Sequence, residues 1–123
     1  MAITLNTKVY NGTGFNVNQQ YVYKETSATY PSGFSYLTAK ANTGTGKKSS
    51  VVCWNLSLPH VADAASTCAC AGDVLGTDYI RIEVDVSAIT SAADRLDIWT
   101  RLRDLVASTP FKDSITALTQ PSA

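Results

Sequence analysis

The sequence predicts an α+β protein in which an antiparallel sheet is followed by two helices. Apolar and polar residues alternate through most of residues 1–86, as they do in strands with one face in water. At Ser91 the period changes to that of a helix. The 123 residues are enough for one core, so we expect a single domain over 1–123.

The first predicted element is a β-hairpin over residues 1–23. Ile3, Leu5 and Val9 alternate with polar residues, and the same pattern returns from Phe15 onward. Between them stands Asn11-Gly12, a dipeptide that favours the positive φ angles of a type I′ turn. The sequence therefore predicts the hairpin turn at Asn11-Gly12.

The sheet is predicted over residues 33–86. Alternating segments cover 34–41, 51–58 and 79–86, each with one apolar and one polar face. Between the last two lies 60–77, a long segment of mostly small side chains that we expect to be a loop. Loops of this length in a short chain are usually functional or mobile.

Two helices are predicted over residues 91–119. Ser91 and Asp94 resemble a capping box, and an apolar stripe with Leu102 at its centre follows at helical spacing over 91–108. Thr109-Pro110 predicts a second helix, with Thr as N-cap and Pro in the first position.

Composition excludes several classes of protein. The formal net charge is zero and 45% of residues are hydrophobic, which argues against disorder. No apolar run is long enough to span a membrane, and the N-terminus lacks the pattern of a secretory signal. The charges are nevertheless uneven, because residues 1–60 hold five lysines and one glutamate. This indicates either an anionic partner or a chance imbalance of solvated charges.

The residues give little support for catalysis or for a metal. His60 is the only histidine, so no nucleophile–base pair can be named. His60, Cys68 and Cys70 could supply three metal ligands, but Cys-x-Cys is not the usual finger spacing. We therefore expect no enzymatic activity, no metal and no cofactor.

Two groups of residues can be interpreted as either purely structural or functional. Cys68 and Cys70 are too close in sequence to bridge each other well, so they are either reduced surface thiols or links to other subunits. The polar sheet face is either solvated or binds RNA, since tyrosine stacks on bases while cations contact phosphates. The candidate RNA-binding residues are Tyr36, Thr38, Lys40, Cys53, Asn55, Tyr79, Arg81 and Glu83.

In order along the chain, several motifs resemble the coat proteins of the single-stranded RNA bacteriophages. They are the early Asn11-Gly12-Thr13-Gly14, the basic Lys47-Lys48, the strand ending Asn55-Leu56-Ser57-Leu58-Pro59, and Tyr79-Ile80-Arg81-Ile82-Glu83 before the capped helix. The two loop cysteines and the segment 105–110 are most similar to the Q-beta-like branch.

The resemblance implies an N-terminal hairpin, a five-stranded antiparallel sheet, and two helices that interlock with a second subunit in an obligate homodimer. Dimers would close into an icosahedral shell in the bacterial host cytoplasm, forming a virion around single-stranded viral RNA without any membrane. Cys68 and Cys70 would form inter-subunit disulfides. The dimer interface would include Trp54, Ile82, Ile98, Trp99 and Leu102.

The resemblance also implies that the polar face binds an RNA hairpin, packaging the genome and repressing translation of the replicase. Tyr79 stands at the family's base-stacking tyrosine, whereas Arg81 stands where the family often has Asn. Asn55 and Cys53 replace a common lysine and threonine, so the identity of the hairpin does not follow. The alternative is a dimeric RNA- or protein-binding module that never assembles.

Overall fold

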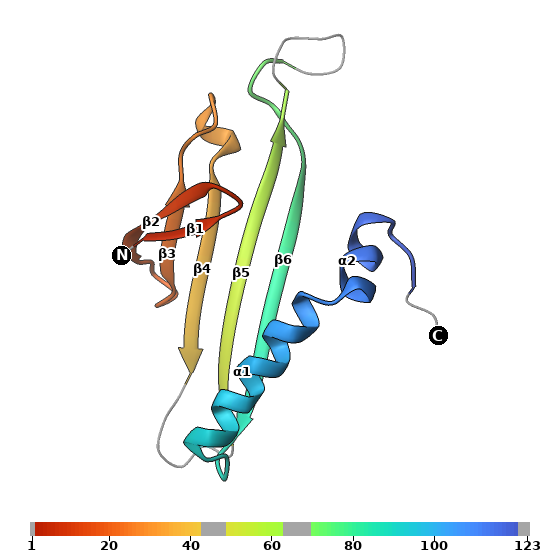
Figure 1. Ribbon diagram of the computed structural model, residues 1–123. Helices are drawn as coiled ribbons and strands as arrows, with labels where there is room; N and C mark the ends of the chain where they lie inside the picture. The colour runs from red at the N-terminus through yellow and green to blue at the C-terminus, as the bar shows by residue number, and fades with distance from the viewer. Residues whose placement is uncertain (1, 43–48, 63–69, 121–123) are drawn as a thin grey trace. The chain divides into compact units, whose positions relative to one another are not determined.

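The computed structural model describes residues 2–42, 49–62 and 70–120, which form two units, residues 1–85 and 86–123. Each strand of the first unit pairs with its neighbour in sequence, so the sheet order is β1-β2-β3-β4-β5-β6 (Figure 1). The strands are β1 (Ala2–Leu5), β2 (Lys8–Phe15), β3 (Tyr21–Glu25), β4 (Ser35–Asn42), β5 (Ser49–Val61) and β6 (Val74–Ser87). A short 3-10 helix, η1 (Pro31–Gly33), precedes β4. The predicted α+β class is confirmed, with six strands instead of five.

The turn predicted at Asn11-Gly12 is wrong. The chain reverses at Asn6 and Thr7, where φ is 47° and 66°, and Asn11 and Gly12 lie inside β2. The glycines serve the pairing of β2 with β3: the register shifts between Gly12 and Gly14, and Gly14 has a φ of 108°. A β-bulge with a glycine at positive φ explains the same composition that suggested a turn.

A second turn connects β2 to β3. The Asn16 carboxamide oxygen accepts hydrogen bonds from the backbone N–H groups of Asn18 (2.9 Å) and Gln20 (3.0 Å). This is the local use of an asparagine side chain that stabilises tight turns. Phe15 and Tyr21, at the two ends of the turn, pack edge to face with ring centroids 5.3 Å apart.

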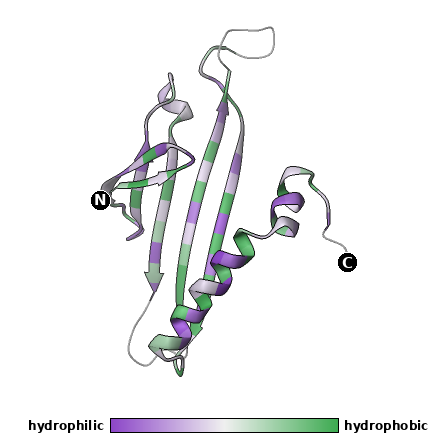
Figure 2. Ribbon diagram, in the orientation of Figure 1, coloured by the Kyte–Doolittle hydropathy of each residue, from purple (hydrophilic) through white to green (hydrophobic). Residues whose placement is uncertain are grey.

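The core of the first unit is small. Tyr10, Tyr23 and Leu37 are buried and in mutual contact, and Ile3, Tyr21, Trp54 and Leu56 pack against them. The registers put Leu37 opposite Leu56 and Ala39 opposite Trp54, so the apolar positions of β4 and β5 share one face. Figure 2 shows the corresponding alternation of hydropathy along these strands. The period-two prediction of which residues share a face is therefore confirmed for β4 and β5. It is wrong for Val9, which was predicted to share the face of Ile3 and Leu5 but lies opposite Thr4 and is 47% exposed, because the chain reverses at Asn6 and Thr7.

The predicted loop 60–77 is shorter than the sequence suggested. β5 continues to Val61 and β6 begins at Val74, so strand structure covers both ends of that segment. The alternating pattern does not reach these strand ends, because His60 takes an apolar position of β5 and the adjacent Val74 and Leu75 do not alternate. The Ala62 N–H donates to the Asp73 carbonyl (2.9 Å), and the Gly72 N–H donates to the Ala62 carbonyl (2.8 Å). These bonds close the loop at its base.

The second unit contains α1 (Ala92–Val106) and α2 (Thr109–Thr116). The Ser91 hydroxyl accepts a hydrogen bond from the Asp94 N–H at 3.2 Å, which confirms the predicted cap. The second helix begins one residue earlier than predicted, with Ser108 as N-cap, although Ser108 makes no side-chain capping bond. Neither helix contains a buried residue.

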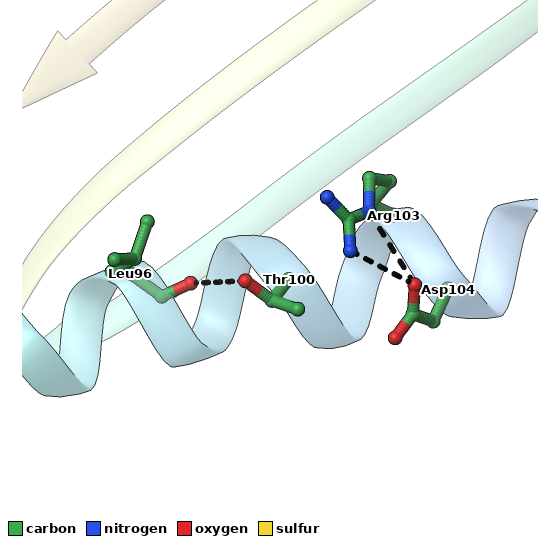
Figure 3. A network of polar contacts seen from close by, with 4 residues as sticks. All are labelled: Leu96, Thr100, Arg103 and Asp104. Carbon is green, nitrogen blue, oxygen red and sulfur yellow. Dashed lines mark hydrogen bonds and ion pairs between the residues drawn. The ribbon is translucent and has the colours of Figure 1, made fainter.

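Polar side chains on α1 bond mostly within the helix. The Thr100 hydroxyl donates to the Leu96 carbonyl (2.9 Å), and Arg103 lies 3.4 Å from its neighbour Asp104 (Figure 3). The predicted pair of Asp97 and Arg101 is formed at 2.8 Å. Exposed pairs of this kind add only a few tenths of a kcal/mol, about 0.3–0.5 for i,i+4 partners. Among the described residues, no helix is long and apolar enough to cross a membrane.

Candidate nucleic-acid interface

The register of β4 against β5 brings the polar positions of both strands onto one face of the sheet. Tyr36 lies opposite Ser57, and Thr38 lies opposite Asn55. Lys40 lies opposite Cys53 at the far end. The face is polar because each of these strands alternates, and the apolar half of the pattern turns toward the core.

A depression of about 430 Å³ lies on this face. Its lining comes from β4, β5 and β6 and includes every predicted RNA-binding residue except Lys40. The lining residues are Tyr36, Thr38, Cys53, Asn55, Leu56, Ser57, Tyr79, Arg81 and Glu83. Side chains that lie far apart in the sequence are thereby collected at one site.

The depression offers both stacking surfaces and hydrogen-bonding groups. Tyr79 is 63% exposed, and the Arg81 guanidinium lies 5.8 Å from the centre of its ring. Asn55 donates from its amide nitrogen to the Cys53 sulfur at 3.6 Å. A broad aromatic surface beside a cation is the arrangement on which an unpaired base stacks while its phosphate meets the charge.

Ser57 and Leu56 line the depression although the site prediction omitted them. The Ser57 hydroxyl lies 3.4 Å from both the backbone nitrogen and the carbonyl oxygen of Tyr36, which ties β5 to β4 at this point. The alternation of β5 already placed Ser57 on the polar face, so the signal was present in the sequence. Leu56 belongs to the apolar face by alternation, so its contribution could not be predicted.

Lys40 is the candidate that the structure separates from the others. It is exposed, and its ammonium donates to the Asn18 carbonyl in the β2–β3 turn at 3.2 Å. It stays on the polar face opposite Cys53 but does not line the depression. Its role in RNA binding remains a prediction.

The predicted dimer-interface residues are only partly covered in the single chain. Trp54 stacks on Tyr23, with centroids 6.2 Å apart and planes 17° from parallel. Ile82 is 36% exposed and Trp99 is 55% exposed. Ile98 and Leu102 are of intermediate exposure.

The residues considered as metal ligands, His60, Cys68 and Cys70, and the cysteines of the predicted disulfides lie in the 60–77 segment. Among the described residues, no group of three or more potential metal ligands occurs. His60 instead pairs with Asp78 across β5 and β6. Cys53 and Cys70 are free thiols, and Cys68 lies outside the described residues.

Comparison with known proteins identifies the class of fold. No protein-family model matches the sequence. No curated protein sequence matches it either. Solved structures do match over nearly the whole chain, and bacteriophage coat proteins and virus-like particles are among them.

Three of these structures show the extent of the match. The virus-like particle of bacteriophage NT-214 has a TM-score of 0.82 and 14% identity, covering 100% of this chain and 95% of the other. The virus-like particle of Beihai levi-like virus 21 has a TM-score of 0.83 and 11% identity, covering 100% and 96%. The bacteriophage GA protein capsid has a TM-score of 0.78 and 13% identity, covering 97% and 95%. The chain thus has the coat-protein fold that the resemblance implied, whereas the Q-beta-like branch stays a prediction.

Proposed function

We propose that this chain is the coat protein of an RNA bacteriophage, which assembles as dimers into an icosahedral shell around single-stranded RNA. The observation that carries the proposal is the end-to-end match in fold with coat proteins and virus-like particles. The role is structural, without catalysis. The protein belongs to the virion and assembles in the host cytoplasm.

The sparse core supports an obligate homodimer. Only Tyr10, Tyr23, Leu37 and Ala62 are buried hydrophobic residues among those described. Single domains of this size normally bury far more, since burial of apolar surface is the main force that stabilises a fold. A second copy would cover the interface residues predicted above, including Ile82 and Trp99.

The end of the sheet supports the same dimer. β6 is the last strand in the sheet order and has fourteen residues, with Ile80 and Ile82 exposed. Long edge strands with apolar side chains pair readily with another chain. Pairing with a second β6 would make a continuous sheet and extend the polar face across both subunits.

The polar face would bind an RNA hairpin, package the genome and repress translation of the replicase. The clustering of Tyr36, Asn55, Tyr79 and Arg81 in one depression supports this assignment. Single-stranded loops are read by stacking on aromatic rings and by hydrogen bonds to base edges, and this site offers both. Affinity would come largely from phosphate contacts and would fall with added salt.

Expression of the full chain tests assembly. Electron microscopy of the purified protein should show uniform particles, and RNA extracted from them should be protected from nuclease. Small dimers without particles would instead support the alternative, a free RNA- or protein-binding module. A monomer that stays folded at working concentration would overturn both.

Filter binding tests the site. Hairpins from the RNA recovered with the particles would be measured against the parent, Tyr79→Ala and Arg81→Ala. Loss of a stacking tyrosine costs about 1–3 kcal/mol per base, so Tyr79→Ala should weaken binding at least about fivefold while particles still form. Val17→Ala, an exposed change in the β2–β3 turn, is the control. Unchanged affinity in both site variants would refute the assignment.

A further inference from the structure

We propose that Lys24 and Phe34 form a second RNA contact on the polar face, in which the Lys24 ammonium binds a phosphate next to the nucleotide in the depression. The inference rests on the proposed function. It extends the proposed RNA-binding surface from β4, β5 and β6 to a fourth strand, β3. Neither residue was among the predicted site residues.

The strand register places Lys24 beside the depression. Lys24 of β3 lies directly opposite Tyr36 of β4, and Tyr36 lies opposite Ser57 of β5. Directly opposed residues point to the same face, so Lys24 shares the face of Tyr36 and Ser57, both of which line the depression. Phe34 precedes Tyr36 by two residues in extended backbone, and the contact of its ring with Lys24 shows that it reaches the same side.

The lysine is held in place but keeps its charge available. Its Nζ lies 5.0 Å from the centre of the Phe34 ring, and the side chain is half-buried. A cation over an aromatic face is fixed by a weak attraction of about 0.5–1 kcal/mol, which limits its motion without neutralising it. Within the described residues, Lys24 forms no ion pair with a carboxylate. The Lys24 ammonium can therefore replace bound water by a phosphate oxygen at a small cost in free energy.

The charges nearby favour an anion. Glu25, the next residue, turns to the opposite face, where its carboxylate accepts a hydrogen bond from the Ser27 N–H. Lys40 is the other charged residue of β3 and β4 on the polar face, and it is also positive. Glu83 lies two strands away from β4, on β6. The polar face of β3 and β4 thus carries two lysines and no carboxylate, beside a depression in which Arg81 and Glu83 balance each other.

The distance between β3 and β6 suits a single strand of nucleic acid. Adjacent strands are about 4.8 Å apart, so β3 and β6 are separated by roughly 14 Å. A strand of RNA that stacks a base on Tyr79 and continues across β5 and β4 would reach Lys24 with a neighbouring nucleotide. Tyr36, 40% exposed, lies on β4 between β6 and β3, where it would support the base of that neighbouring nucleotide.

The test is the salt dependence of binding to a labelled oligouridine, whose phosphates are present without any hairpin sequence. One phosphate contact on a single strand contributes about 0.7 to the slope of log affinity against log salt. Lys24→Gln should lower the slope by that amount and the affinity about fivefold at about 0.1 M salt. Lys24→Arg keeps the charge and should restore both. Lys112→Gln, on α2, is the matched control and should match the parent.

The outcomes separate this inference from the function on which it rests. If Tyr79→Ala weakens binding while Lys24→Gln keeps the parent slope, the second contact is wrong and the depression stands. If neither variant differs from the parent, both fail. Equal losses in Lys24→Gln and Lys24→Arg would mean that Lys24 acts through structure, which would also overturn the phosphate contact. Particle yield and circular dichroism verify folding, and Lys24→Met replaces the Gln variant if that variant does not fold.

Discussion

The Tyr10 hydroxyl lies 2.7 Å from the Ser35 hydroxyl in the core of the first unit, which links β2 to β4 through a buried polar contact. Ser35 in turn donates to the Ser57 carbonyl at 2.6 Å. Since the Ser35 proton is used in that bond, Tyr10 is the donor to Ser35. Three strands are thus connected by one chain of hydrogen bonds.

Tyr10→Phe should therefore destabilise the protein by about 1 kcal/mol, the usual net value of a hydrogen bond. Ser35 keeps its bond to Ser57, so the loss stays moderate. The free energy of unfolding in urea, at one fixed protein concentration, measures the effect. Tyr21→Phe is the matched control, because the Tyr21 hydroxyl has no hydrogen-bond partner within the described residues. Equal effects of the two changes would contradict the prediction.

Glu25 should make the protein sensitive to acid. The side-chain hydrogen bond from Ser27 holds the pKa of Glu25 below its ordinary value of 4.5, and the Ser27 N–H and the charge of Lys8 act in the same direction, against the effect of burial. A carboxyl whose pKa is lowered by folding stabilises the protein above its unfolded pKa. That stabilisation is lost as the pH falls through the folded value.

Glu25→Gln should accordingly cost about 1–2 kcal/mol near neutrality, and the difference from the parent should shrink below pH 4.5. Urea midpoints over a pH series measure this. Glu83→Gln, an exposed change with no hydrogen bond or ion pair to lose in the described structure, provides the comparison. A difference from the parent that stays constant with pH would exclude the linkage.

Trp99 should contribute strongly to the proposed dimer. It is 55% exposed in the single chain, with the Arg103 guanidinium 5.1 Å from its ring centre. Buried tryptophans in interfaces commonly contribute 2 kcal/mol or more, so Trp99→Ala should raise the dimer dissociation constant by about 30-fold or more. Sedimentation of the unassembled protein measures it. Val17→Ala, which changes an exposed apolar residue of the first unit, should leave the constant unaltered.

Gly14 and Gly76 should respond differently to the same substitution. A methyl group would meet nothing within 4 Å at either position, but Gly14 has a positive φ. Gly14→Ala should cost about 1–2 kcal/mol, because an L side chain is strained there. Gly76→Ala, in β6, should be neutral or slightly stabilising, since alanine loses less chain entropy than glycine. Thermal melts of the two variants would distinguish them, and a similar loss in both would rule out backbone strain as the cause.

Cys70 should take part in links between subunits. It is exposed and free, and the Asp73 carboxylate accepts a hydrogen bond from its backbone N–H at 2.8 Å, so its position at the base of the loop is fixed. Oxidised particles should run as multimers on gels without reductant, and the double change Cys68→Ser and Cys70→Ser should give monomers and a lower melting temperature. Cys53→Ser, on the polar face, should not alter the pattern. Multimers that persist in the double variant would place the links elsewhere.

The sequence predicted the faces of the strands better than the turns. Alternation depends only on neighbouring residues, so it placed Thr38 and Asn55 on the polar side correctly. The prediction of a turn at Asn11-Gly12 was wrong because the same dipeptide also suits a β-bulge. Only the pairing of β2 with β3 decides between a turn and a bulge. The predicted ends of the 60–77 loop were wrong because His60 and the adjacent Val74 and Leu75 interrupt the alternation.

The candidate site was predictable where its residues lie on alternating strands. Lys24 and Phe34 were missed because their relation to the depression depends on the register of β3 against β4, which the sequence does not specify. Lys40 was included by alternation, yet its ammonium bonds to the turn at Asn18, a contact between segments 22 residues apart. Contacts between distant segments therefore explain why Lys24 and Phe34 were omitted and why Lys40 lies apart from the other candidates.

The closed base of the β5–β6 loop has a practical consequence. Ala62, Gly72 and Asp73 join the two strands by backbone hydrogen bonds, and Ser32 adds a bond to the Gly72 carbonyl. Chain added between residues 62 and 70 would start and finish at this junction, and doubling a loop's length costs only about 0.6 kcal/mol. A foreign epitope grafted there would leave the strand register intact, and in the proposed shell each subunit would display one copy of it.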